Sequence, residues 1–106
     1  MHKLSSWRPR VDATRSEGEL LQVVRDYLDA WLPSELSQLP EICQNCRPSS
    51  VEELTHYAVD FKRAEFTFAG SPEAQELLRE MSQTFAHAAE RLRIFHHPAV
   101  SRGGEG

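Results

Sequence analysis

Apolar residues recur at alternating steps of three and four along three separate stretches of this 106-residue chain. This spacing places side chains on one face of an α-helix, whereas a half-buried strand would alternate apolar and polar residues. The longest run covers residues 71–97 and comprises Ala74, Leu78, Met81, Phe85, Ala88, Leu92 and Phe95. The pattern predicts an all-α fold whose helices pack with coiled-coil-like spacing.

Two shorter runs predict two further helices, each beginning at a helix-capping signal. Their apolar positions are Leu20, Val24, Tyr27 and Trp31 in the first run, and Leu54, Tyr57, Phe61, Ala64 and Phe68 in the second. Ser16 and Glu19 have the spacing of a capping box at the start of the first run, with Thr14 as an alternative start. Ser50 and Glu53 repeat that spacing before the second run.

The sequence Gly70-Ser71-Pro72 predicts a tight turn between the second and third helices. Glycine can adopt the left-handed conformation that often ends a helix, and a serine followed by proline is a typical helix start. A short link of this kind makes neighbouring helices antiparallel. We therefore expect an antiparallel three-helix bundle with the hairpin of helices two and three at its centre.

The third predicted helix is longer than its partner in the hairpin. At 1.5 Å per residue, about 26 residues outreach about 19 by roughly 10 Å. The overhang carries Leu92, Ile94 and Phe95, which need a cover. Either the connector over residues 36–42 folds across them or a second chain does, and we favour a homodimer.

Composition fits one folded domain flanked by two irregular segments. Hydrophobic residues make up 40% of the chain and charged residues 26%, as in ordinary globular proteins. Residues 1–13 show no sustained period and contain Pro9, which predicts a flexible basic arm anchored by Trp7. Residues 14–97 form the predicted helical bundle domain, and residues 98–106 the predicted disordered tail.

The charge distribution and the hydropathy pattern limit the kinds of partner that the chain is expected to bind. The net charge is −4, divided between +3 over residues 1–15 and −7 over the remainder. An acidic body makes nucleic-acid binding unfavourable, because phosphates are bound by broad basic surfaces. No run approaches the about 20 apolar residues that span a bilayer, so we expect no membrane segment and a cytoplasmic location.

Cys43 and Cys46 form a Cys-x-x-Cys pair in the Pro-bounded connector. A closed zinc site would need two further ligands, which only histidines such as His56 could supply. A redox pair would normally precede a helix in a βαβ setting, which is lacking here. We interpret the cysteines as two small, partly buried residues in a loop, and keep a metal-binding or redox protein using them as the alternative function.

Residues at the two ends of the chain form the predicted partner-binding surface. The third helix ends in a cationic cluster that suits its dipole and could contact an acidic partner. The basic arm could join it. The predicted surface comprises Trp7, Arg8, Arg10, Arg91, Leu92 and Phe95.

The sequence contains no glycine-rich phosphate loop and no nucleophile elbow. We therefore expect no catalytic residues and no cofactor. The leading hypothesis is a non-enzymatic helical interaction module, a homodimer that binds a protein partner. A small enzyme with a pocket lined by Tyr27, Trp31 or Tyr57 is a third hypothesis.

Overall fold

The structure, a computed structural model, describes residues 4–96. Within that range it contains helices and no strand, so the all-α prediction is confirmed there. The helices are α1 (Leu4–Asp12), α2 (Glu17–Asp29), α3 (Pro33–Leu36), α4 (Glu41–Gln44), α5 (Val51–Thr67) and α6 (Pro72–His96). The predicted tail over residues 98–106 lies outside the described residues.

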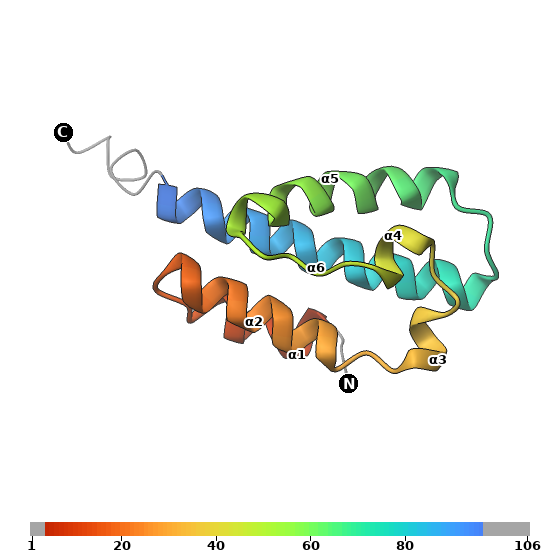
Figure 1. Cartoon of the computed structure of the whole chain (residues 1–106), viewed down its shortest axis with the longest axis horizontal. Coiled ribbons are helices and arrows are strands. Elements are labelled where there is room, and N and C mark those ends of the chain that lie inside the picture. Colours follow the sequence, from red (N-terminus) through yellow and green to blue (C-terminus); the bar gives the residue numbers. More distant parts are fainter. Residues whose placement is uncertain (1–3, 97–106) are drawn as a thin grey trace.

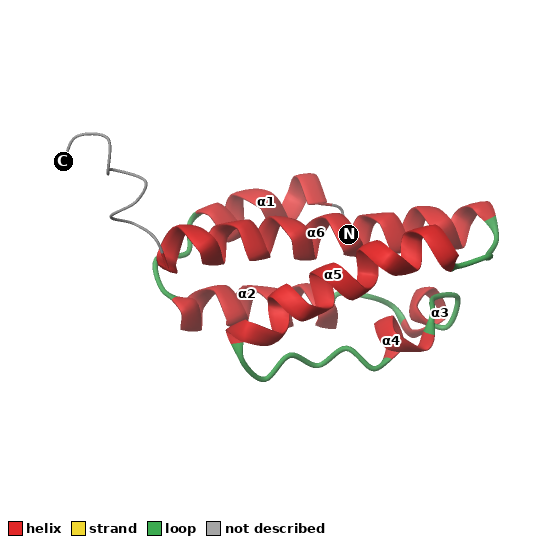
Figure 2. Cartoon of the chain, turned by 90° about the horizontal axis from the view of Figure 1, so that it is seen from above, coloured by secondary structure: helices red, strands yellow, loops and turns green. Residues whose placement is uncertain are grey.

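The long helix α6 is the centre of the molecule, because α1, α2 and α5 all pack against it (Figure 1). α5 and α6 form the predicted antiparallel hairpin and share the most extensive contact. α1 and α2 form a second hairpin beside it, as the view from above shows (Figure 2). Four longer helices therefore pack together, where the sequence predicts three.

Capping chemistry explains where α2 and α6 begin. The Ser16 hydroxyl accepts a hydrogen bond from the backbone N–H of Glu19 at 3.2 Å, as the capping-box spacing predicts. The Ser71 hydroxyl accepts in the same way from the N–H of Ala74 at 3.1 Å, with Pro72 as the first residue of α6. Both predicted helix starts are confirmed.

The end of α5 differs from the prediction. α5 ends at Thr67, and Gly70 does not take the left-handed conformation, since no described glycine has a positive φ. A Cβ atom at Gly70 would instead collide with the ring of Phe68. Glycine here leaves room for the Phe68 ring, which would have to shift for any larger residue, and is not needed for its φ angle.

The arm predicted for residues 1–13 is instead helical over Leu4–Asp12, although Pro9 lies inside the helix. Trp7 and Val11 are one helical turn apart, and their exposed fractions are 7% and 1%. The Thr14 hydroxyl donates to the carbonyl of Val11 at 2.6 Å and so satisfies one group at the helix end. Packing of this short apolar stripe outweighs the hydrogen bond that proline cannot donate.

α1 also lies along the predicted overhang of α6. His87 Nε2 and Asp12 Oδ1 are within hydrogen-bond distance at 2.8 Å, and Arg91 Nη2 donates to the carbonyl of Thr14 at 2.6 Å. Leu92 is 3% exposed within the single chain. The connector with α3 and α4 lies near the opposite end of α6 (Figure 1). Leu92 is thus buried within the single chain as a member of its hydrophobic core, while α1 packs along α6.

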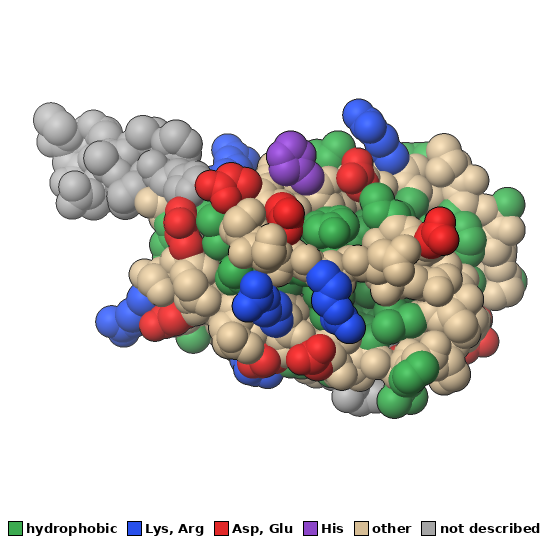
Figure 3. All heavy atoms as spheres, viewed as in Figure 1, with side chains coloured by type: hydrophobic (Ala, Val, Ile, Leu, Met, Phe, Trp, Pro, Cys, Tyr) green, Lys and Arg blue, Asp and Glu red, His purple; other side chains and the backbone are tan. Residues whose placement is uncertain are grey.

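The surface carries both signs of charge, interspersed on the face that Figure 3 displays. In the described part of the chain, no helix is both long enough and apolar enough to cross a membrane.

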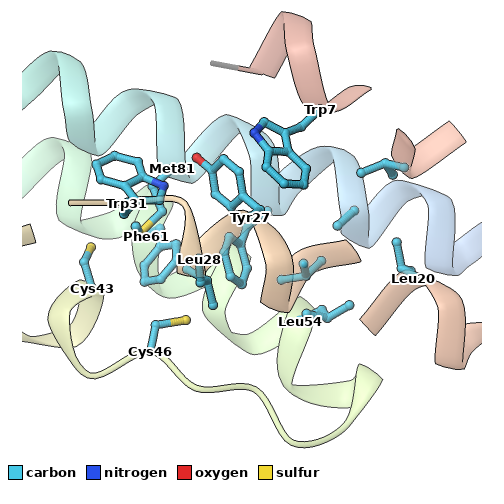
Figure 4. Packing of buried hydrophobic residues seen from close by; sticks show 14 of the residues in the cluster. Trp7, Leu20, Tyr27, Leu28, Trp31, Cys43, Cys46, Leu54, Phe61 and Met81 are labelled. Carbon is cyan, nitrogen blue, oxygen red and sulfur yellow. The ribbon is translucent and has the colours of Figure 1, made fainter. Parts of the chain in front are cut away.

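Aromatic side chains from several helices meet in the core (Figure 4). The ring of Tyr27 meets Trp7 edge-on at 5.5 Å between centroids, and Trp31 at 6.1 Å. Phe61 of α5 meets Phe85 of α6 at 4.9 Å, also edge-on. Such edge-to-face pairs add stabilisation beyond the burial of their area. They bind α1, α2, α5 and α6 into one core.

Candidate interaction surface

Cys43 and Cys46 are free thiols directed into the core (Figure 4). Each is 2% exposed. Burial raises the pKa of the Cys43 thiol to about 12 and moves the pKa of Cys46 in the same direction. Both thiols are therefore protonated at neutral pH, whereas metal binding and thiol–disulfide exchange require the thiolate. This arrangement favours the interpretation of the pair as small core residues.

His56 lies on the exposed side of α5 and does not approach the buried cysteines as a ligand. Its neighbour Glu53 accepts hydrogen bonds from the N–H of Ser49 at 2.6 Å and from the Ser49 hydroxyl at 3.3 Å. Over residues 4–96, no three or more His, Cys, Asp and Glu side chains are placed to hold a metal ion together. The structure does not bring these candidate ligands together.

The apolar members of the predicted partner-binding surface belong to the core of the monomer. Trp7 and Leu92 are buried, and Phe95 is half-buried with the Arg91 guanidinium 5.1 Å from its ring centroid. Trp7 and Leu92 therefore offer no free apolar surface, because α1 is a packed helix and not an arm. Ile94 of the overhang stays 47% exposed.

The basic members have structural partners as well. Arg91 donates to the carbonyl of Thr14. Arg10 lies 4.3 Å from the ring centroid of Trp7 and pairs with Asp26 at 3.2 Å. Arg8 is exposed on α1, beside His87. Of the predicted surface, Arg8 therefore remains the residue most accessible to a partner.

A different apolar surface is exposed on α5. Phe66 is 82% exposed and Val59 is 47% exposed. They are seven residues apart, which is two helical turns, so they lie on one line of the helix surface. Along the upper edge of Figure 3, where α5 runs, a histidine and a basic side chain project outward.

Charged residues lie along this line as well. Glu52 lies seven residues before Val59, and Arg63 lies between Val59 and Phe66, one turn after Val59. Neither Glu52 nor Arg63 forms an ion pair or side-chain hydrogen bond with any described residue. We define the α5 outer face as Glu52, Thr55, His56, Val59, Lys62, Arg63 and Phe66, all of them exposed.

The sequence did contain a signal for this face. The second apolar run assigns Phe61 and Phe68 to the core, and Phe66 falls outside their spacing. A phenylalanine outside the apolar stripe of a helix is exposed unless another element covers it. Sequence reasoning followed the stripe and did not consider the aromatic residue beside it.

Comparison with protein-family models, with curated proteins and with solved structures gives no match.

Proposed function

We propose that this chain is a non-enzymatic helical interaction module that forms a homodimer through the α5 outer face. The exposure of Phe66, 82%, supports this more than any other observation. Full burial of a phenylalanine side chain stabilises by about 1.5–3 kcal/mol relative to exposure, which a partner could supply. The same side chain contributes little to the stability of the monomer.

A second copy is the occupant that the charge pattern favours. In a two-fold symmetric dimer the same face meets itself, so two α5 helices would run antiparallel with the axis near Val59. Glu52 of one copy would then lie opposite Phe66 of the other copy. Arg63 of that other copy is about one turn away, within reach of Glu52. Neither charge has a partner among residues 4–96 of its own chain. Pairing between copies would satisfy both at once.

The length of α5 sets the expected strength of this dimer. Its 17 residues span about 25 Å. One pair of helices of that length buries less area than the roughly 1,600 Å² of a standard interface. We therefore expect a weak, concentration-dependent dimer with a dissociation constant in the micromolar range.

Sedimentation equilibrium across a concentration series tests the dimer. Phe66→Ala should raise the dissociation constant about tenfold or more, because one buried aromatic anchor is lost. Leu32→Ala is the matched control, since Leu32 is 59% exposed but lies outside α5. A wild-type chain that remains monomeric up to about 1 mM, or a Leu32→Ala variant as impaired as Phe66→Ala, would overturn the proposal.

Charge reversal tests the antiparallel register separately. Glu52→Arg and Arg63→Glu should each weaken the dimer, because each places like charges together across the interface. The double variant should restore much of the lost affinity. Weakening without restoration would argue against the antiparallel pairing of these two residues.

The free thiols bear on where such a module would act. Cys43 and Cys46 are reduced and buried, which suits a reducing compartment. We therefore place the chain in the cytoplasm as part of this proposal. Fractionation of native cells that recovers the chain outside the cytoplasm would contradict this placement.

A further inference from the structure

A pocket of about 380 Å³ lies between α2 and the segment that follows α4. It is lined by Arg25, Leu28, Asp29, Arg47, Pro48 and Ser49. On the face shown in Figure 3, basic side chains lie close together beside hydrophobic ones. The volume falls within the range of small-molecule sites in proteins.

One wall of the pocket is a face of α2. Arg25, Leu28 and Asp29 are three and four residues apart, so their side chains lie on the same side of that helix. Arg25 Nε donates to the carbonyl of Pro48 at 3.2 Å, which holds the guanidinium at the pocket. Its two Nη groups make no hydrogen bond or ion pair with any described residue. They are available to a ligand.

The opposite wall carries a second guanidinium. Arg47 is 77% exposed in its side chain and is 4.0 Å from Asp29, which is 74% exposed. An exposed pair at this separation contributes little free energy. Arg47 can therefore exchange Asp29 for a ligand anion at small cost. The three charged side chains leave the pocket with one net positive charge.

The remaining lining residues define what else the ligand needs. Leu28 and Pro48 are buried and give the pocket an apolar floor. The Ser49 hydroxyl and N–H are both engaged by Glu53 Oε1. Recognition of an anion therefore depends on the two arginines, with apolar contact from the floor.

We propose that this pocket binds a small organic carboxylate with an apolar body. Guanidinium groups match the planar carboxylate with paired hydrogen bonds, and two of them face the same space here. One negative charge on the ligand balances the one net positive charge of the pocket. A doubly charged phosphate would meet more repulsion from Asp29 and would leave the apolar floor without contact.

Titration of the ¹⁵N-labelled chain with isovalerate, at constant ionic strength, tests this by following amide signals of residues 28 and 49. We expect saturable shifts, weaker shifts with acetate, and the weakest with phosphate. Absence of saturable shifts with isovalerate up to about 20 mM would overturn the proposal. Phosphate binding as tight as isovalerate would overturn the assignment to carboxylates.

Three variants identify the source of the binding. Arg47→Ala should weaken isovalerate binding about tenfold, because a charge-assisted contact is lost. Asp29→Asn should tighten it, because the competing carboxylate is removed. Arg79→Ala is the control, since Arg79 is an exposed arginine paired with Glu76 on α6. If Arg47→Ala and Arg79→Ala weakened isovalerate binding equally, the loss would come from the change in net charge alone. That result would contradict binding in this pocket.

The pocket and the α5 outer face rest on different residues. Phe66→Ala should therefore bind isovalerate with unchanged affinity, and Arg47→Ala should dimerise like the wild type. Loss of both properties in either variant would contradict this separation.

Discussion

The two faces of α5 place the same type of residue in opposite environments. Phe61 and Phe66 are five positions apart, with exposed fractions of 0% and 82%. Five residues correspond to about 500° of rotation, which puts the two rings on nearly opposite sides of the helix. The inner ring meets Phe85 and Tyr57, at 4.9 Å and 5.6 Å between centroids. The outer ring is left to solvent.

This contrast separates what stabilises the fold from what is free to bind. A residue fully buried in the monomer contributes to folding and can contact a partner only if the fold opens. A large apolar residue in solvent adds little to the core and is free to contact a partner. The inner face of α5 is therefore the place to test the fold, and the outer face the place to test the function.

Phe61→Ala is expected to have the largest effect on stability. Removal of a fully buried phenylalanine leaves a cavity and should lower the free energy of unfolding by about 3–5 kcal/mol. Urea denaturation followed by circular dichroism measures the loss. A loss below about 1 kcal/mol would mean that the inner face of α5 is not part of the cooperative core.

Trp7→Ala asks whether α1 belongs to the same core. Trp7 is 7% exposed and packs edge-on against Tyr27. Its truncation should lower the free energy of unfolding by about 3 kcal/mol. Ser6→Ala, at an exposed position of the same helix, should change it by less than about 0.5 kcal/mol. Equal, small effects of both variants would show that α1 is not docked.

The difference between α1 and the α5–α6 hairpin also explains which helices can be predicted from the sequence. α5 and α6 have 17 and 25 residues, long enough for their apolar repeats and capping residues to be recognised. α1 has nine residues with Pro9 inside, and its apolar positions Leu4, Trp7 and Val11 span only two helical turns. A run this short, interrupted by proline, does not establish a period. Its helicity depends on packing against α6, which the sequence alone does not reveal.

The candidate sites were predictable to different degrees. The α5 outer face could be read from the sequence, because Phe66 is outside the apolar spacing of a recognisable helix. The pocket could not, because Arg25 and Pro48 are joined through the path of an irregular connector. The sequence predicts Trp7 and Leu92 as surface residues because neither segment has a recognisable cover. In the structure α1 and α6 pack against each other and both residues are buried.

The buried thiol of Cys43 is titratable, so its burial should make the stability of the fold depend on pH. Burial raises the pKa of the folded-state thiol to about 12, above its ordinary value of 9.0, so the folded state retains a proton that the unfolded state loses. The stabilisation is complete below pH 9 and is lost as the pH rises toward 12. Between pH 8 and pH 10, the free energy of unfolding should fall by about 1 kcal/mol more in the wild type than in Cys43→Ala. Parallel pH profiles for the two proteins would show that the thiol is not buried.

Phe66→Ala should have the smallest effect on folding and so completes the comparison with Phe61→Ala. At 82% exposure the outer ring has few contacts to lose, so the free energy of unfolding should change by less than about 0.5 kcal/mol at concentrations below the dimer range. Above that range the wild type should gain stability with concentration, because the dimer forms only from folded chains, and the variant should not. A loss of more than about 2 kcal/mol in the dilute variant would mean that Phe66 packs within its own chain. The outer face would then belong to the fold, and the dimer would lose its anchor.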